Sequence, residues 1–217
     1  NLAIKGIFEM YAGKGNHIIT CTAEHKSVLD ACKNLERKDA AITYLPVNEE
    51  GLIDVNDLES AILPETILIA VMYANNETGV IQNIREISKI VHAKNSIFFC
   101  DATQAIGKIP LDVQADGIDL LCLSAHKFYG PKGIGALYVR RKNPRVTPEP
   151  LIHGGGHERG LRSGTLNVPL IVGLGKACEI ISHINAGKTI RDAFEQTLLK
   201  KFGNTIQVNG IGAYRLP

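Results

Sequence analysis

Short apolar runs that alternate with helical patterns are the feature that most restricts how this chain folds. The helical spacing of apolar residues predicts helices at 2–11, 27–37, 55–62, 84–94 and 168–183. Runs rich in aliphatic and β-branched residues predict strands at 17–21, 41–45, 66–72, 96–101, 119–124 and 136–140. Several of these runs are apolar throughout, which is typical of strands covered on both faces. We therefore predict an α/β fold with a mostly parallel sheet and helices on both faces.

The pattern changes near the end of the chain. The segment NAGK at 185–188 follows the long helical pattern, and a further helix and a short strand at 205–208 are predicted after it. We interpret residues 1–185 as a large domain and residues 186–217 as the beginning of a smaller α+β domain. Because the chain starts at Asn1 and stops at Pro217 without a closing element, we expect it to be a piece of a longer protein.

Composition excludes several classes of function. The net charge is +2 and basic runs are short, so neither nucleic acid nor an anionic membrane is an expected partner. The apolar runs are too short to span a bilayer. The five cysteines lack CxxC spacing, which argues against a disulfide framework and a zinc site and favours a reducing cytoplasm. His153 and His157 have metal-ligand spacing, but the three glycines between them disfavour a helix, so no metal is expected.

Polar residues follow directly after four of the predicted strands. The segments are TAEHK after 17–21, YANNETG after 66–72, DATQAIG after 96–100 and SAHK after 119–123. Parallel sheets of this class bind ligands at the carboxyl ends of their strands. These segments are therefore the predicted functional site.

Lys127 stands at the end of an apolar strand, in the segment SAHK. A lysine in a turn is usually a solvated surface residue, and that interpretation stays open. In a dry pocket, however, a lysine loses much of its preference for protonation and can form a Schiff base with an aldehyde. Pyridoxal phosphate is such an aldehyde, and it also needs an acid at its pyridine nitrogen, a group stacked on its ring and donors for its phosphate.

The neighbouring segments supply candidates for each of these roles. Asp101 ends a buried run, where a carboxylate is costly unless it meets a cation such as a protonated pyridine; the alternative is a helix N-cap. Gln104 is placed to contact the ring hydroxyl, and His25 to lie over the ring, although a surface histidine is the simpler interpretation. Ser124 and His126 flank the lysine as donors for phosphate oxygens.

Two further segments are similar to known functional motifs but lack the residues that those motifs require. The segment GPKGIG lacks the spacing of a Walker A loop. The segment HGGG at 153–156 is similar to an esterase oxyanion loop, but the chain has no GxSxG nucleophile elbow.

Taken together, the motifs resemble those of the cysteine desulfurases, which belong to the class V aminotransferase branch of the fold-type I pyridoxal-phosphate-dependent enzymes. The matching segments are TAEHKSVLD, NNETG, DATQAIGK, SAHKFYGPKGIGALYVRR and GGGHERGLRSGTLNVP, and they cover nearly the whole chain. RSGT resembles the group that supplies iron–sulfur cluster assembly. The resemblance implies that residues 1–185 are the cofactor-binding domain, and that the enzyme is a sulfurtransferase converting L-cysteine to L-alanine while sulfur passes to an enzyme persulfide.

The resemblance also implies a role for each candidate residue. Lys127 would hold pyridoxal 5'-phosphate as a Schiff base, Asp101 would pair with the pyridine nitrogen, and His25 would stack on the ring and assist proton transfer. Gln104 would contact the ring hydroxyl, and Asn76 would lie beside cofactor and substrate.

The phosphate contacts imply an assembly. Ser124, Ala125 and His126 would hold the phosphate, while Thr165 would reach the phosphate of another subunit, so a homodimer is expected. An iron–sulfur scaffold or another sulfur-acceptor protein would be the further partner.

The chain departs from the family pattern at both ends. The persulfide-forming cysteine and the arginine that binds the substrate carboxylate are expected beyond Pro217, and a Gly–Ala–Thr phosphate segment before Asn1. The five cysteines are interpreted as inert core thiols on strands and helix faces, except that Cys21 lies near the site. Alternatives are a selenocysteine lyase, an aminotransferase, or a catalytically incomplete module that binds a cofactor or a partner.

Overall fold

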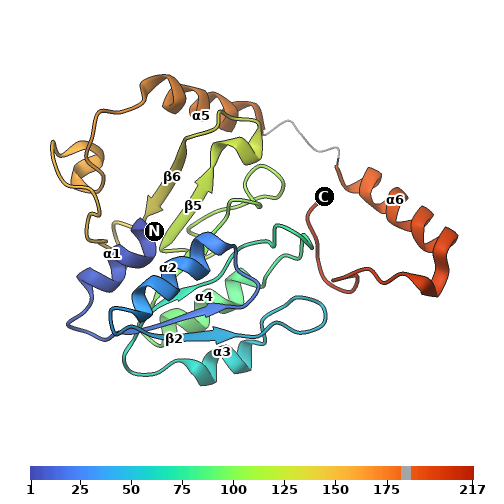
Figure 1. Ribbon diagram of the computed structural model, residues 1–217, viewed down its shortest axis with the longest axis horizontal. Coiled ribbons are helices and arrows are strands. Elements are labelled where there is room, and N and C mark those ends of the chain that lie inside the picture. Colours follow the sequence, from blue (N-terminus) through green and yellow to red (C-terminus); the bar gives the residue numbers. More distant parts are fainter. Residues whose placement is uncertain (182–186) are drawn as a thin grey trace.

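A six-stranded sheet forms the centre of the computed structural model, which describes residues 1–181 and 187–217 (Figure 1). The strand order is β2-β1-β3-β4-β5-β6; the first five strands pair in parallel, and β6 pairs antiparallel to β5. The strands are β1 (His17–Cys21), β2 (Ala41–Leu45), β3 (Thr66–Ala70), β4 (Ile97–Asp101), β5 (Leu120–Ser124) and β6 (Gly135–Val139). The predicted mostly parallel sheet is confirmed.

Helices alternate with the strands up to β4, as the sequence predicts. They are α1 (Leu2–Met10), α2 (Lys26–Glu36), α3 (Val55–Ala61), α4 (Ile84–Ala93), α5 (Val168–Ile181) and α6 (Gly187–Phe202), with short 3₁₀ turns η1 (Ala125–Phe128), η2 (His157–Gly160) and η3 (Gly203–Thr205). The end of the helix predicted at 168–183 and the domain boundary predicted between 185 and 186 lie outside the described residues. No helix in the described part of the chain is long and apolar enough to cross a membrane.

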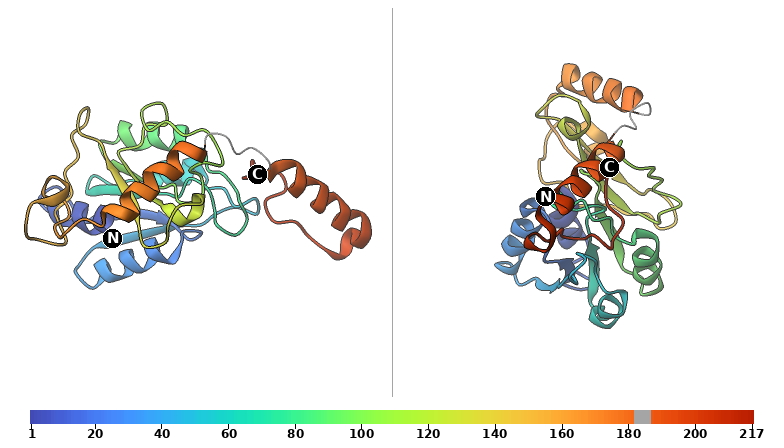
Figure 2. Two further views of the ribbon diagram at one scale, coloured as in Figure 1. Left: turned by 90° about the horizontal axis from the view of Figure 1, so that it is seen from above. Right: turned by 90° about the vertical axis from the view of Figure 1, so that its right-hand side faces the viewer.

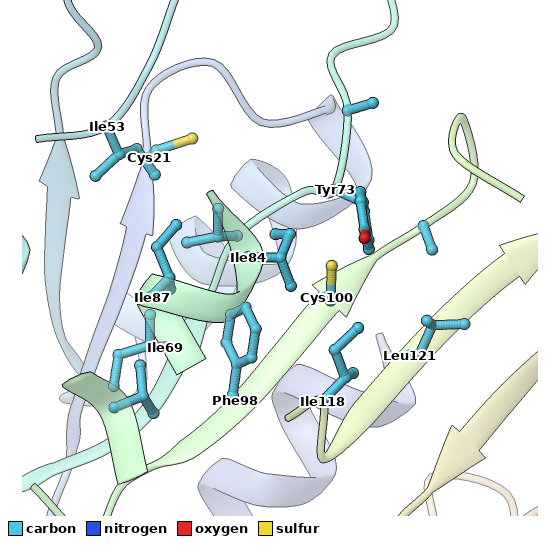
Figure 3. Packing of buried hydrophobic residues seen from close by; sticks show 14 of the residues in the cluster. Cys21, Ile53, Ile69, Tyr73, Ile84, Ile87, Phe98, Cys100, Ile118 and Leu121 are labelled. Atoms are coloured by element: carbon cyan, nitrogen blue, oxygen red, sulfur yellow. The ribbon is translucent and has the colours of Figure 1, made fainter. Parts of the chain in front are cut away.

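Helices cover both faces of the sheet. Successive residues of a strand point to opposite faces, so neighbouring residues pack against different helices. Ile18 and Phe99 pack in one apolar cluster with α1 and α2. Ile19 and Phe98 pack in a second cluster with α3 and α4, part of which is drawn in Figure 3. A third, smaller cluster joins α5 to η1. The two clusters on opposite faces of the sheet explain why the strand runs are apolar throughout.

The predicted strand at 205–208 is wrong. Residues 203–205 form the turn η3, and residues 206–208 have no regular structure. Residues 206–208 lie between this turn and the turn at 209–212, and they pair with none of the six strands of the sheet. The chain then returns to the turn after β3, where the amide of Ile81 donates to the carbonyl of Tyr214 (2.8 Å), while α6 lies at one end of the molecule beyond the sheet (Figure 2).

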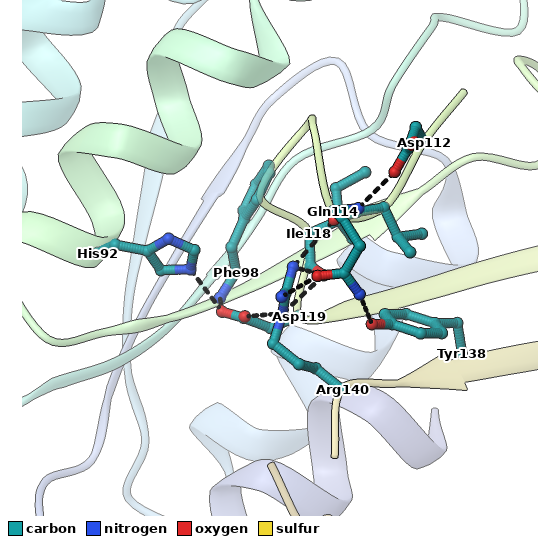
Figure 4. Close-up of polar contacts among 9 residues, drawn as sticks. His92, Phe98, Asp112, Gln114, Ile118, Asp119, Tyr138 and Arg140 are labelled. Atoms are coloured by element: carbon teal, nitrogen blue, oxygen red, sulfur yellow. Dashed lines mark hydrogen bonds and ion pairs between the residues drawn. The ribbon is translucent and has the colours of Figure 1, made fainter. Parts of the chain in front are cut away.

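A buried charge cluster fixes the start of β5 (Figure 4). Asp119 is fully buried, and its Oδ2 atom accepts a hydrogen bond from the amide of Phe98 (3.0 Å) and lies 2.9 Å from Nε2 of His92. Nε of Arg140 lies 2.9 Å from Oδ1 of Asp119, although its N–H is directed to the carbonyl of Ile118. The cluster therefore ties together α4, β4, β5 and the end of β6.

Candidate active site at the carboxyl edge of the sheet

Four segments with polar side chains meet at one edge of the sheet. The strands β1, β3, β4 and β5 are neighbours in that order, and they run parallel, so their carboxyl ends lie at the same edge. Since adjacent strands are about 4.8 Å apart, these ends fall within about 15 Å of one another. The segments that follow the strands are 22–25, 72–76, 102–104 and 125–127.

Lys127 lies on the 3₁₀ turn that follows β5. The side chains of Ala125 and Phe128 are buried under this turn against α5, so the side chains of His126 and Lys127 face outward. The amine of Lys127 is exposed, in contrast to the dry position considered from the sequence. Burial lowers the pKa of the nearby Lys108, and the positive charge of Lys127 lowers it further.

The atoms available to a phosphate group are fewer than the sequence suggests. Oγ of Ser124 and Nδ1 of His126 are 2.9 Å apart and face the same region. The amide of Ala125, however, already donates to the carbonyl of Ile134 (3.1 Å). Of the three residues predicted to hold the phosphate, Ser124 and His126 therefore offer side-chain atoms, whereas Ala125 has neither a polar side chain nor a free amide. Thr165 is exposed in the loop between β6 and α5.

Asp101 is buried at the end of β4, with an exposed fraction of 7%. Its Oδ1 atom accepts from the amide of Thr103 (2.9 Å), and burial, followed by the charge of Asp101, raises the pKa of the neighbouring Cys122 thiol on β5. The bond to Thr103 has the form of a cap, but no regular helix follows. None of the ion pairs among the described residues includes Asp101. Gln104, three residues on, accepts at Oε1 from Nζ of Lys108 (2.8 Å).

His25 caps the amino end of α2. Its Nδ1 atom accepts from the amide of Ser27 (3.2 Å) and lies 2.9 Å from the Ser27 hydroxyl, while the ring is exposed. An Nδ1 that accepts a hydrogen bond places the proton of the neutral ring on Nε2. The cap thus gives this histidine one orientation and one tautomer.

Asn76 is exposed, whereas the preceding Asn75 holds the turn in place. Nδ2 of Asn75 donates to the carbonyl of Ala23 (2.9 Å), and its Oδ1 accepts from the amides of Glu77 (2.8 Å) and Thr78 (2.9 Å). Sequence reasoning overlooked Asn75. Asparagine accepting bonds from the residues that follow it is a turn signal that could have identified it.

Glu24 is a second residue that sequence reasoning missed. Its carboxyl group is buried and bonds to the amide of Met72, and burial together with the charge of Asp101 raises its pKa to about 8. A charged residue at or shortly after the end of an apolar strand was the signal, as it was for Asp101.

The five cysteines do not form a reactive site. Cys21, Cys32 and Cys100 are buried, and burial raises the pKa of each thiol, that of Cys32 to about 12. A nucleophilic cysteine needs the opposite shift, since the thiolate is the reactive form. The expectation that Cys178 lies in the core is wrong: it is exposed, because the face of α5 that carries it points away from η1.

The class-V aminotransferase family matches residues 1–212. The chain belongs to this family. Among its members, the cysteine desulfurase IscS of Glaesserella parasuis is 57% identical over 197 residues, which cover 88% of this chain and 48% of the relative. The IscS of Haemophilus influenzae is 50% identical over the whole chain and 54% of its own length. The chain thus spans about half the length of the curated relatives it matches, and the resemblance to cysteine desulfurases is confirmed.

Solved structures of similar proteins agree with the fold. DndA from Streptomyces lividans superposes with a TM-score of 0.88 at 35% identity, over 99% of this chain and 62% of that chain. A NifS-like protein superposes with a TM-score of 0.87 at 36% identity, over 100% of this chain and 60% of that chain. SspA in complex with cysteine superposes with a TM-score of 0.82 at 42% identity, over 93% of this chain and 57% of that chain.

The side chains of this class-V site fit pyridoxal phosphate. A buried carboxylate with no ion-pair partner among the described residues, such as Asp101, is suited to a protonated pyridine nitrogen. Ser124 and His126 offer a hydroxyl and an imidazole to a phosphate, next to the amine of Lys127. This donor set matches the needs of the cofactor.

Proposed function

We propose that this chain is the cofactor-binding part of a pyridoxal-phosphate-dependent cysteine desulfurase. The observation that carries the proposal is its 57% identity to a cysteine desulfurase over 88% of the chain. The position of Lys127, Asp101 and His25 at one sheet edge supports it. The full-length enzyme would convert L-cysteine to L-alanine and pass the sulfur to a persulfide on a cysteine.

The side chains at this edge of the sheet would have different chemical roles. When bound, pyridoxal phosphate supplies an aldehyde for amines and a ring that accepts electrons from the substrate. Asp101 would keep a proton on the pyridine nitrogen, because its buried carboxylate is stabilised by a facing positive charge. Lys127 would hold the cofactor covalently, and its amine would remove the proton from the substrate α-carbon once the substrate has displaced it.

The remaining residues would position cofactor and substrate. His25, oriented by its cap on α2, would stack on the ring and assist proton transfer through Nε2. Gln104 would contact the ring hydroxyl and Asn76 the substrate side of the cofactor. Ser124 and His126 would bind the phosphate through their side chains, with the buried Ala125 supporting the turn.

The proposed enzyme is a homodimer in the cytoplasm. Thr165 is exposed, as a residue that binds the phosphate of another subunit must be. The cytoplasm suits a chain whose five cysteines are all unpaired thiols. The sulfur acceptor would be a protein such as an iron–sulfur scaffold, in keeping with the relatives named IscS.

The test is an assay of the full-length enzyme with L-cysteine and a reductant, measuring sulfide and alanine in equal amounts. We expect Lys127→Ala to lower the rate by about a thousandfold or more, since it removes both the attachment and the base. Lys132→Ala, at an exposed lysine of the following loop, is the matched control and should keep the rate. Faster turnover with L-selenocysteine, or transamination with a keto acid and no sulfide, would contradict the proposal.

A further inference from the structure

Glu24 is a buried acid beside the site with one oxygen atom left unpaired. Its exposed fraction is 6%. Oε1 accepts from the amide of Met72 and from the thiol of Cys21 (3.7 Å), whereas Oε2 is buried with no hydrogen-bond partner in the described part of the chain. No ion pair within residues 1–181 and 187–217 includes this carboxyl group. Because both bonds are made to Oε1, Oε2 is the atom left to carry a proton, and a proton there would remove an uncompensated charge from a buried position.

The surroundings of Glu24 favour this neutral form. The titratable groups that interact electrostatically with Glu24 are Cys21 at the end of β1, Cys32 on α2, and Cys100 and Asp101 on β4. All of them are acids, so none offers a compensating positive charge. Burial, and then the charge of Asp101, raise the pKa of Glu24 to about 8, although a backbone hydrogen bond acts in the other direction.

Glu24 also connects two segments of the site. Its bond to Met72 joins the loop after β1 to the end of β3. Asn75 adds a second connection to the same loop through the carbonyl of Ala23 (2.9 Å). Because His25 follows Glu24 directly, these bonds hold its backbone near the turn after β3, while the cap on α2 orients its ring.

We propose that Glu24 is a positioning residue that acts in its protonated form, holding His25 against the end of β3 and adding no negative charge beside Asp101. The inference rests on the proposed function, which makes His25 and Asp101 site residues. An ionised Glu24 would repel the carboxylate of Asp101 and favour its protonation. A protonated Asp101 can no longer keep a proton on the pyridine nitrogen.

The protonation of Glu24 can be measured without the cofactor. Full-length enzyme prepared free of pyridoxal phosphate is compared by infrared spectroscopy with Glu24→Gln and with Glu9→Gln, a control at an exposed glutamate of α1. At mildly acidic pH we expect the carbonyl band of a buried carboxylic acid in the wild type and in Glu9→Gln, and its loss in Glu24→Gln. The band should disappear as the pH rises through about 8. Equal bands in the wild type and Glu24→Gln overturn the inference.

The positioning role can be measured in the pH profile of the enzyme with bound cofactor. Glu24→Ala removes the acceptor for Met72, and we expect it to lower kcat/KM for L-cysteine by more than about tenfold. Glu24→Gln keeps an acceptor and stays uncharged, so it should restore most of that loss. Relative to the wild type it should gain activity above pH 8, by about tenfold per pH unit, because only the wild type ionises there.

The outcomes separate this inference from the proposed function. An enzyme that releases no sulfide disproves the proposed function, and the infrared band still reports the state of Glu24. An active enzyme whose decline in activity at alkaline pH is the same in Glu24→Gln overturns the inference alone. If Glu24→Ala does not fold, the infrared spectrum and the pH profile of Glu24→Gln decide.

Discussion

Removing the carboxylate of Asp119 should destabilise the protein far more than removing any exposed acid. Asp119→Ala leaves the amide of Phe98 buried without its acceptor and deprives the buried guanidinium of Arg140 of its counter-charge. Loss of one member of a buried ion pair costs about 3–5 kcal/mol. Arg140 keeps the carbonyls of Ile118 and Val113 as acceptors, which places the expected loss near the lower end, about 3 kcal/mol. Asp119→Asn keeps an oxygen for the Phe98 amide and should lose less, about 1–3 kcal/mol.

The assay is urea unfolding of the full-length enzyme without cofactor, followed by two spectroscopic probes. The control is Glu59→Ala, which removes an exposed pair with Lys94 at 3.5 Å and should change the free energy of unfolding by less than about 1 kcal/mol. We expect the order Asp119→Ala, then Asp119→Asn, then Glu59→Ala. A loss for Asp119→Ala as small as that for Glu59→Ala would refute the reasoning that this cluster holds β4, β5 and β6 together.

Three further predictions follow from burial and charge. Phe98→Ala should lower the free energy of unfolding by about 3–5 kcal/mol, measured in the same urea assay, because its ring is fully buried between the sheet and α4. Asp101→Asn keeps the bond to the Thr103 amide but loses the charge, so kcat for sulfide release should fall by about a hundredfold to a thousandfold with little change in unfolding. Glu24 holds a proton in the folded protein up to about pH 8, whereas the unfolded chain releases it near the ordinary value of 4.5. As the pH rises from about 4.5 to about 8, the free energy of unfolding of the wild type should therefore decrease relative to that of Glu24→Gln, by up to about 5 kcal/mol in urea titrations. Parallel pH dependences of the two proteins would contradict this.

The fold could be predicted because its signals are local. The run at 66–72 is apolar throughout, and such a run is buried on both faces wherever it lies in a parallel sheet. Helix α4 could be predicted from the helical spacing of Ile84, Ile87 and Val91, all of which are buried. The strand predicted at 205–208 has no neighbouring strand with which to form hydrogen bonds. A local sequence pattern does not show whether such a partner strand exists.

The site could be predicted only as far as the strand ends. The rule that ligands collect there selected Lys127, Asp101 and His25. The bonds between side chains and distant backbone were not accessible from the sequence. The Ala125 amide is occupied by the carbonyl of Ile134, and Glu24 is paired with an amide 48 residues away. Such pairings depend on strand order and register, which cannot be inferred from local patterns in the sequence.

Two buried aspartates on adjacent strands show how a functional charge can be told from a structural one. Asp119, at the amino end of β5, has an amide, an imidazole and a guanidinium around it, all supplied by the chain. Asp101, at the carboxyl end of β4, has a backbone amide and a thiol, and no ion pair in the part of the chain that the structure describes. Both have the same cost of burial to offset, so burial alone does not separate them. The difference lies in the source of the positive charge: the ion pairs among the described residues supply one to Asp119 and none to Asp101. A buried carboxylate without an ion pair is suited to a cation from a ligand, and Asp101 lies at the edge of the sheet where the ligand is expected.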